Sequence, residues 1–217
     1  LKYQSFVGYY PIPIRYGKTI GGLTKAIIKN KWISPLPKID IIDTEGWTED
    51  LWFDQTDLTW VNPSPNIQSL EAAILYPGMC LLEGTNISEG RGTSDPFKWF
   101  GSTWIDGLKI SEALTKFNLP GVKFIPKIKT PKSIPGKAIN PKFKNEECQG
   151  VEVWITNRNE YLSVSTGLLI LFTINNMYPH KIKLNQKFIN MLWGDEHLYN
   201  ELKNNSTGIH FIDNYVK

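Results

Sequence analysis

The chain has 217 residues, of which 41% are hydrophobic and 21% are charged, as is usual for a folded globular protein and not for a disordered or fibrous one. Its 24 basic and 21 acidic side chains leave a net charge of +3, a bias too small to favour nucleic acid or an anionic membrane surface as the main partner. No apolar run approaches the length of about 18 residues that suggests a transmembrane helix, so we expect no membrane insertion.

The first part of the chain combines short predicted elements with irregular stretches. We predict a strand over residues 6–10, a helix over 20–31 that begins after Thr19, and a buried strand over 38–43. Residues 48–66 show no periodicity and end in a proline-rich run, which predicts a linker or a domain border.

Helices and strands alternate in the second part. We predict a helix over 69–76, ended by Pro77 and Gly78, and a short apolar strand over 79–82. Residues 130–145 are rich in Pro, Lys and Gly, which is typical of an exposed loop. The remaining predicted elements are helices over 110–117, 167–178, 186–192 and 195–203, and strands over 122–127 and 150–155. This order predicts an α/β fold, with α+β as the alternative.

Aromatic residues make up 12% of the chain, and five tryptophans stand among Gly, Pro, Asp and Asn, where aromatics often line a groove. These tryptophans are Trp47, Trp52, Trp60, Trp99 and Trp104. Cys80 and Cys148 are in no C-x-x-C pair, and the three histidines have no metal-ligand spacing. We therefore expect two buried thiols, no metal site and no organic cofactor.

The densest polar cluster is the glycine-spaced run over residues 83–93, EGTNISEGRGT. It contains no phosphate-binding G-x-x-x-x-G-K-[ST] pattern and no G-x-S-x-G elbow of a serine hydrolase. Two carboxylates, Glu83 and Glu89, fit the acid–base pair of glycoside hydrolysis instead. Their spacing in sequence leaves open which is the acid and whether the reaction retains or inverts configuration.

This run also resembles a known family. Residues 75–93, LYPGMCLLEGTNISEGRGT, are similar to the signature of the NamZ-type exo-β-N-acetylmuramidases, long catalogued as a domain of unknown function. Supporting similarities lie at residues 6–17, 46–47, 52–54, 64–66 and 101–106. Two positions depart from the pattern, because Tyr16 stands where the family commonly has His and Lys98 where it commonly has Glu.

The resemblance implies a two-part protein with its active site between a Rossmann-like N-terminal domain and a smaller α/β C-terminal domain. Residues 1–66 are then the end of the first domain, and residues 67–217 are the second. It also implies a bacterial glycosidase of cell-wall recycling, extracellular or periplasmic, which releases N-acetylmuramic acid from the non-reducing end of peptidoglycan fragments. Its partners are then muramyl saccharides.

Under this interpretation Glu89 or Glu83 acts at the anomeric centre or on its leaving oxygen. A guanidinium pairs bidentately with a carboxylate, so Arg91 is the expected partner of the lactyl group of muramic acid, and Arg15 is the alternative. The remaining expected contacts are hydrogen bonds from Asn86 and Ser88 and ring stacking on Trp104 or Tyr10.

Two other hypotheses remain open at this point. A carbohydrate-binding or accessory domain without catalysis needs only the aromatic residues and the polar run. The remnant of a broken gene would fold poorly, because missing strands would leave a sheet edge exposed.

Overall fold

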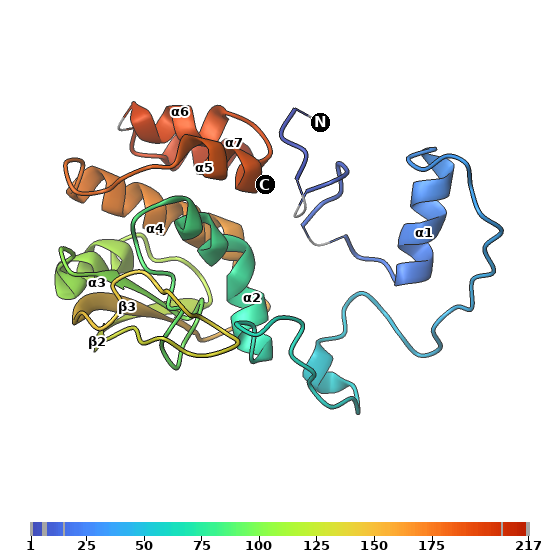
Figure 1. Ribbon diagram of the computed structural model, residues 1–217, viewed down its shortest axis with the longest axis horizontal. Helices are drawn as coiled ribbons and strands as arrows, with labels where there is room; N and C mark the ends of the chain where they lie inside the picture. Colours follow the sequence, from blue (N-terminus) through green and yellow to red (C-terminus); the bar gives the residue numbers. More distant parts are fainter. Residues whose placement is uncertain (1, 6–7, 15, 205, 216–217) are drawn as a thin grey trace.

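A computed structural model describes residues 2–5, 8–14, 16–204 and 206–215. Figure 1 shows a body of packed helices and strands that begins at α2 (Leu70–Met79), and an N-terminal segment that runs apart from this body and carries α1 (Ile20–Lys29). Every buried side chain among the described residues lies at or after Ala72. The hydrophobic core therefore belongs to the second part of the chain.

Three antiparallel strands form the sheet of the body. They are β1 (Trp99–Ser102), β2 (Val122–Lys129) and β3 (Cys148–Ile155), in the order β1-β3-β2. The predicted strands over 122–127 and 150–155 are confirmed, whereas β1 is an element that the sequence does not predict. The expectation of mixed helix and sheet is confirmed as well, and the antiparallel pairing is the arrangement that an α+β fold has.

Helix α4 (Ser163–Met177) is the centre of the body. Its residues are buried without interruption from Ser165 to Asn175, and it packs against α2, α3 (Gly107–Thr115) and α7 (Ile209–Tyr215). Two further helices, α5 (Gln186–Trp193) and α6 (His197–Lys203), lie beyond α4 in Figure 1. The predicted helices over 110–117, 167–178, 186–192 and 195–203 are thus confirmed with shifted ends.

Helices α2 and α4 cross at two glycines. A Cβ atom on Gly78 would collide with the Ser163 carbonyl oxygen, and one on Gly167 would collide with the backbone of Gly78. Glycine at both positions lets the two backbones touch, which places the C-terminal end of α2 directly against the start of α4.

The predicted end of the helix at Pro77 is wrong, because α2 continues to Met79. Ser163 of α4 bonds the last turn on either side of the proline: its hydroxyl accepts from the Gly78 N–H at 3.0 Å and donates to the Leu75 carbonyl at 3.2 Å. Contacts with the neighbouring helix thus hold the last turn of α2 together beyond the proline.

Two predicted strands are also wrong. Residues 79–82 lie in the end of α2 and in the 3₁₀ helix η2 (Cys80–Gly84), since periodicity in a short apolar run does not separate strand from helix. Residues 38–43 form no strand, and Ile42 is 96% exposed, so this apolar run has no buried face. The strand over 6–10 falls partly outside the described residues, and residues 8–10 are not in a strand.

The N-terminal segment contains α1, capped by Thr19 as predicted, and the 3₁₀ helix η1 (Phe53–Gln55). It contacts the body near both of its ends. Lys2 and Tyr3 bond the carboxylate of Glu196, and Arg158 Nη1 lies 2.6 Å from a carboxylate oxygen of Asp54. Near its C-terminal end the Asn66 amide also donates to the Lys137 carbonyl at 2.9 Å, so the segment is attached to the body at several places.

No described helix is both long and apolar enough to cross a membrane. Cys80 and Cys148 are free thiols, and burial raises the pKa of Cys80 to about 12 and that of Cys148 to about 11. Both side chains are therefore protonated thiols of low reactivity at neutral pH. Cys148 is buried as expected, whereas Cys80 is only partly buried.

Candidate active site

The polar run over residues 83–93 begins in η2, not after a strand, and is held against the sheet. Ser88 and Gly101 of β1 exchange two backbone hydrogen bonds, of 2.9 and 3.0 Å, and the Phe97 N–H donates to the Glu89 carbonyl at 2.7 Å. Gly90 turns the chain with φ +89°. A Cβ atom there would lie 2.5 Å from the Asp95 carbonyl oxygen, so only glycine fits this turn.

The turn brings two carboxylates onto one guanidinium. Nη1 of Arg91 lies 3.0 Å from Oε2 of Glu83 and 2.9 Å from Oε1 of Glu89. The two carboxylates differ in access to solvent, because the side chain of Glu83 is 16% exposed and that of Glu89 only 6%. We call Glu83, Glu89 and Arg91 the Arg91 cluster; these are three of the predicted site residues, and the fold brings them together.

Lys142 joins the Arg91 cluster from the segment over residues 130–145. Its ammonium group donates to three oxygens: Oε2 of Glu89 at 3.0 Å, the Ile87 carbonyl at 2.8 Å and the Leu82 carbonyl at 3.2 Å. An ammonium has three N–H donors, so these bonds use all of them. The sequence analysis missed Lys142, since one lysine in a lysine-rich loop has no local signal.

Glu89 is a buried, ionised carboxylate. Burial alone would raise its pKa, but the charges of Lys142 and Arg91 and their hydrogen bonds outweigh this effect and hold the pKa below its ordinary value. Burial likewise opposes the charge of Arg91, while Glu83 and Glu89 raise the pKa of its guanidinium. Glu89 and Arg91 therefore stay charged at neutral pH.

Aromatic rings form one wall of the Arg91 cluster. The guanidinium carbon of Arg91 lies 4.8 Å from the centre of the Phe97 ring, and Tyr76 packs edge-on against the same ring at 4.8 Å. Burial is the main cause that raises the pKa of Tyr76, and the nearby Cys80 and Glu83 raise it further. Tyr76 and Phe97 are site neighbours that the sequence analysis did not select.

Asn86 and Ser88 lie in the same run but are bonded to the protein backbone. The Asn86 amide donates to the Lys181 carbonyl at 3.0 Å and accepts from the Lys183 N–H at 2.7 Å. The buried Ser88 hydroxyl accepts from the Gly90 N–H at 3.3 Å. In this structure both side chains stabilise the shape of the run.

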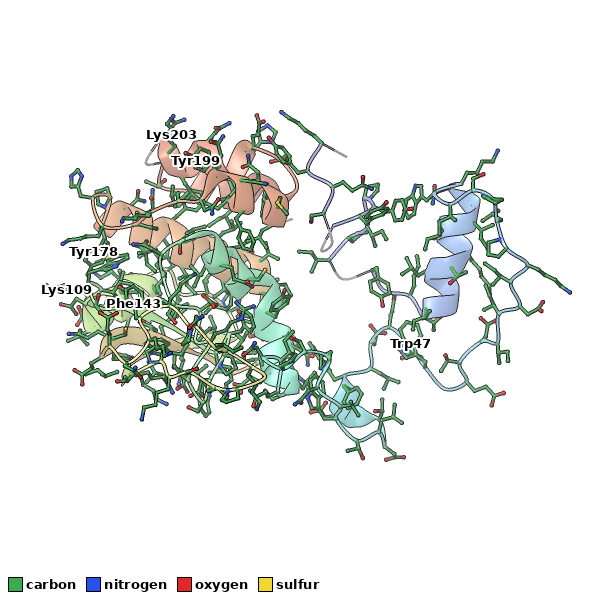
Figure 2. All side chains as sticks on the ribbon, in the orientation of Figure 1. Trp47, Lys109, Phe143, Tyr178, Tyr199 and Lys203 are labelled. Atoms are coloured by element: carbon green, nitrogen blue, oxygen red, sulfur yellow. The ribbon has the colours of Figure 1, made fainter. Side chains whose placement is uncertain are left out.

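Trp104 and Tyr10, the two aromatic residues expected to stack on a sugar ring, have their ring contacts outside the Arg91 cluster. Trp104 packs against Tyr178 with ring centres 5.7 Å apart, and Tyr10 stacks on Trp32 in the N-terminal segment at 4.7 Å. Figure 2 shows Trp47 on that segment, away from Phe143 and Tyr178 of the body. Arg15 lies outside the described residues.

The described residues contain no group of three or more His, Cys, Asp or Glu side chains that could hold a metal ion. A cavity of about 600 Å³ opens beside Gly92 and Thr93, and the cations Lys129, Lys132 and Lys137 line it.

Lys98 stands where the sequence pattern commonly has Glu. Its ammonium group forms an ion pair with Glu71 of α2.

Two family models match consecutive parts of the sequence. Residues 1–71 match "Exo-beta-N-acetylmuramidase NamZ, N-terminal", and residues 74–217 match "Exo-beta-N-acetylmuramidase NamZ, C-terminal". The chain belongs to the NamZ family. A curated NamZ relative, the peptidoglycan beta-N-acetylmuramidase of Bacillus subtilis (strain 168), is 36% identical over 220 residues, which cover 100% of this chain and 50% of the relative.

Two crystal structures of DUF1343 family proteins from Bacteroides fragilis NCTC 9343 have the same fold. One superposes with a TM-score of 0.87 at 24% identity and covers 99% of this NamZ-family chain and 56% of its own. The other has a TM-score of 0.72 at 27% identity, with coverages of 99% and 55%. The chain thus spans about half the length of the relatives that it matches, and the resemblance seen in the sequence is confirmed.

Proposed function

We propose that this chain is part of a glycosidase that releases N-acetylmuramic acid from the non-reducing end of peptidoglycan fragments. Membership of the NamZ family and the activity in the name of the Bacillus subtilis relative support the reaction class. The observation that carries the site assignment is the unequal environment of the two carboxylates that share Arg91.

Glu83 is the reactive carboxylate in this proposal. A group that exchanges protons with substrate needs access to it and a pKa near the working pH. Glu89 meets neither condition, because it is 6% exposed and two cations hold its pKa down. Glu83 is more exposed and lies at the end of η2, so it acts at the anomeric centre or on the leaving oxygen.

Arg91 binds the lactyl carboxylate of muramic acid. Both of its carboxylate partners bond the single nitrogen Nη1, on a guanidinium that carries five N–H donors in a planar fork. Its side chain is 29% exposed and rests on the Phe97 ring, which fixes the plane of the fork. A substrate carboxylate then bonds the other edge of the fork.

The domain organisation is part of the same proposal. We place the end of a Rossmann-like N-terminal domain at residues 1–66 and the C-terminal domain at 67–217, an arrangement supported by the start of the buried core at Ala72. Muramyl saccharides are the partners, and the protein acts outside the cytoplasmic membrane. Arg15, Tyr10, Asn86, Ser88 and Trp104 are the further substrate contacts proposed from the sequence.

The decisive experiment incubates the purified chain with a chromogenic β-glycoside of N-acetylmuramic acid and, as control, with the matching N-acetylglucosamine glycoside. The proposal predicts release of the aglycone from the muramic substrate alone. Calorimetry with free N-acetylmuramic acid on the same sample measures binding. Binding without release would assign the alternative function of a carbohydrate-binding domain, and neither binding nor release by the folded chain would overturn the proposal.

A further inference from the structure

We propose that Lys142 is a positioning residue that sets the net charge of the Arg91 cluster and thereby allows it to accept an anionic sugar. This inference rests on the function proposed above. Lys142 lies 53 positions after Glu89 in sequence, outside the signature run, and contacts the site only because the segment over 130–145 folds back onto it.

The charges of the site are balanced only when Lys142 is counted. Glu83 and Glu89 contribute two negative charges and Arg91 one positive charge, so the Arg91 cluster alone carries −1. Lys142 brings the sum to zero. Tyr76 and Cys80 add no charge at neutral pH, because burial raises the pKa of both groups.

The balance matters because the expected ligand is an anion. Without Lys142, Arg91 is the one cation among the described residues that is ion-paired with Glu83 and Glu89, and the excess negative charge repels a third carboxylate. With Lys142 in place, Glu89 has a second cation at its Oε2 in addition to Arg91 at its Oε1, so the negative charge around Arg91 is compensated before a substrate carboxylate arrives. Lys142 thus acts on the substrate through Glu89 and Arg91 without touching it.

Lys142 also fixes the backbone on which the carboxylates stand. Its bonds to the carbonyls of Leu82 and Ile87 join the residue before Glu83 to the middle of the run. A purely structural role would depend on these two bonds and not on charge, so the experiment must separate charge from anchoring.

The experiment compares Lys142→Met, Lys142→Arg and the double variant Glu89→Gln/Lys142→Met with wild type. Lys144→Met is the matched control, an exposed lysine of the same segment. The readouts are KM and kcat for the muramic glycoside and for its lactyl amide, an analogue of similar shape without the charge. Thermal unfolding verifies that each variant is folded.

We expect Lys142→Met to raise KM for the muramic glycoside at least about tenfold, equivalent to ~1.4 kcal/mol, and to leave KM for the amide unchanged. Lys142→Arg retains the charge and should keep KM near wild type. The double variant restores a net charge of zero and should recover most of the lost affinity, a rescue that an anchoring role does not predict. Equal losses on both substrates, or no rescue, would overturn the proposal.

A second measurement does not depend on activity. Carbon-13 NMR of the glutamate carboxyl groups follows the titration of Glu89, and Lys142→Met should raise the pKa of this group while Lys144→Met should not. If wild type neither binds nor cleaves the muramic substrate, the proposed function fails, and this titration alone decides the role of Lys142. An unchanged Glu89 titration would reject that role.

Discussion

Glu83, in η2, and Glu89, directly before the Gly90 turn, bond the same nitrogen atom, Nη1 of Arg91. They are alike in sequence but not in environment, since one is partly open to solvent and the other is buried between two cations. Their chemical roles are expected to differ for that reason, and four predictions follow from the geometry.

Glu83→Gln should lower kcat for the muramic glycoside at least about a hundredfold without unfolding the protein, because the amide cannot exchange a proton. Glu89→Gln should instead lower the free energy of unfolding by about 2 kcal/mol, since two partly exposed cations lose their shared anion. Steady-state kinetics and urea unfolding separate the two effects. Glu112→Gln, on the exposed face of α3, is the control, and full activity of Glu83→Gln would contradict the assignment.

Arg91→Lys should reduce the preference for the muramic over the glucosamine glycoside at least about tenfold, because a lysine does not form the planar two-bond contact with a carboxylate. The measurement is the ratio of kcat/KM values for the two glycosides. Arg158→Lys, which alters the exposed ion pair with Asp54, is the matched variant and should leave the ratio unchanged. A preserved ratio in Arg91→Lys would place recognition of the lactyl group elsewhere.

The pH dependence of stability should reflect the charge of Glu89. Its pKa in the folded protein lies below the ordinary value of 4.5, so its contribution to stability is fully present above about pH 4.5 and is lost as the pH falls through the folded pKa. Wild type should therefore lose stability in acid more steeply than Glu89→Gln, as measured by thermal unfolding from neutral pH downward. The cation Lys129 similarly lowers the pKa of Asp95 against the effect of burial. Part of the loss of stability in acid should therefore remain in Glu89→Gln.

Gly90→Ala should destabilise the fold more than Gly136→Ala. Both glycines have positive φ angles, +89° and +73°, so both substitutions strain the backbone by about 1 kcal/mol. Only at Gly90 does the added methyl group also meet backbone oxygens, those of Asp95 at 2.5 Å and Trp99 at 2.8 Å, whereas nothing lies within 4 Å at Gly136. Equal unfolding free energies for the two variants would show that the turn can relax.

The sequence was most informative where the pattern is local. Thr19 as a helix cap, the helix around Ile110 and the strand that begins at Val122 follow from side chains and spacing within a few residues. The group of Glu83, Glu89 and Arg91 was predictable for the same reason, because one short polar run carries all three.

The errors have a common physical cause, which is dependence on distant partners. The turn of α2 that follows Pro77 is bonded by Ser163, 86 positions after the proline, and Ile42 is in no strand because no described segment pairs with it. Lys142 reaches Glu89 only through the folded path of its loop. None of these contacts can be inferred from the residues that neighbour the position in sequence.

Two of the attachments of the N-terminal segment, at Glu196 and at Arg158, make the residues between Tyr3 and Asp54 a closed loop and not a free tail. The entropy lost in closing a loop grows slowly, by about 0.6 kcal/mol for each doubling of its length. Insertions or deletions there should cost little, and relatives are free to vary in length at this place. Residues 83–93 have no such freedom, because the run begins in η2, is bonded to β1 at Ser88 and is largely buried.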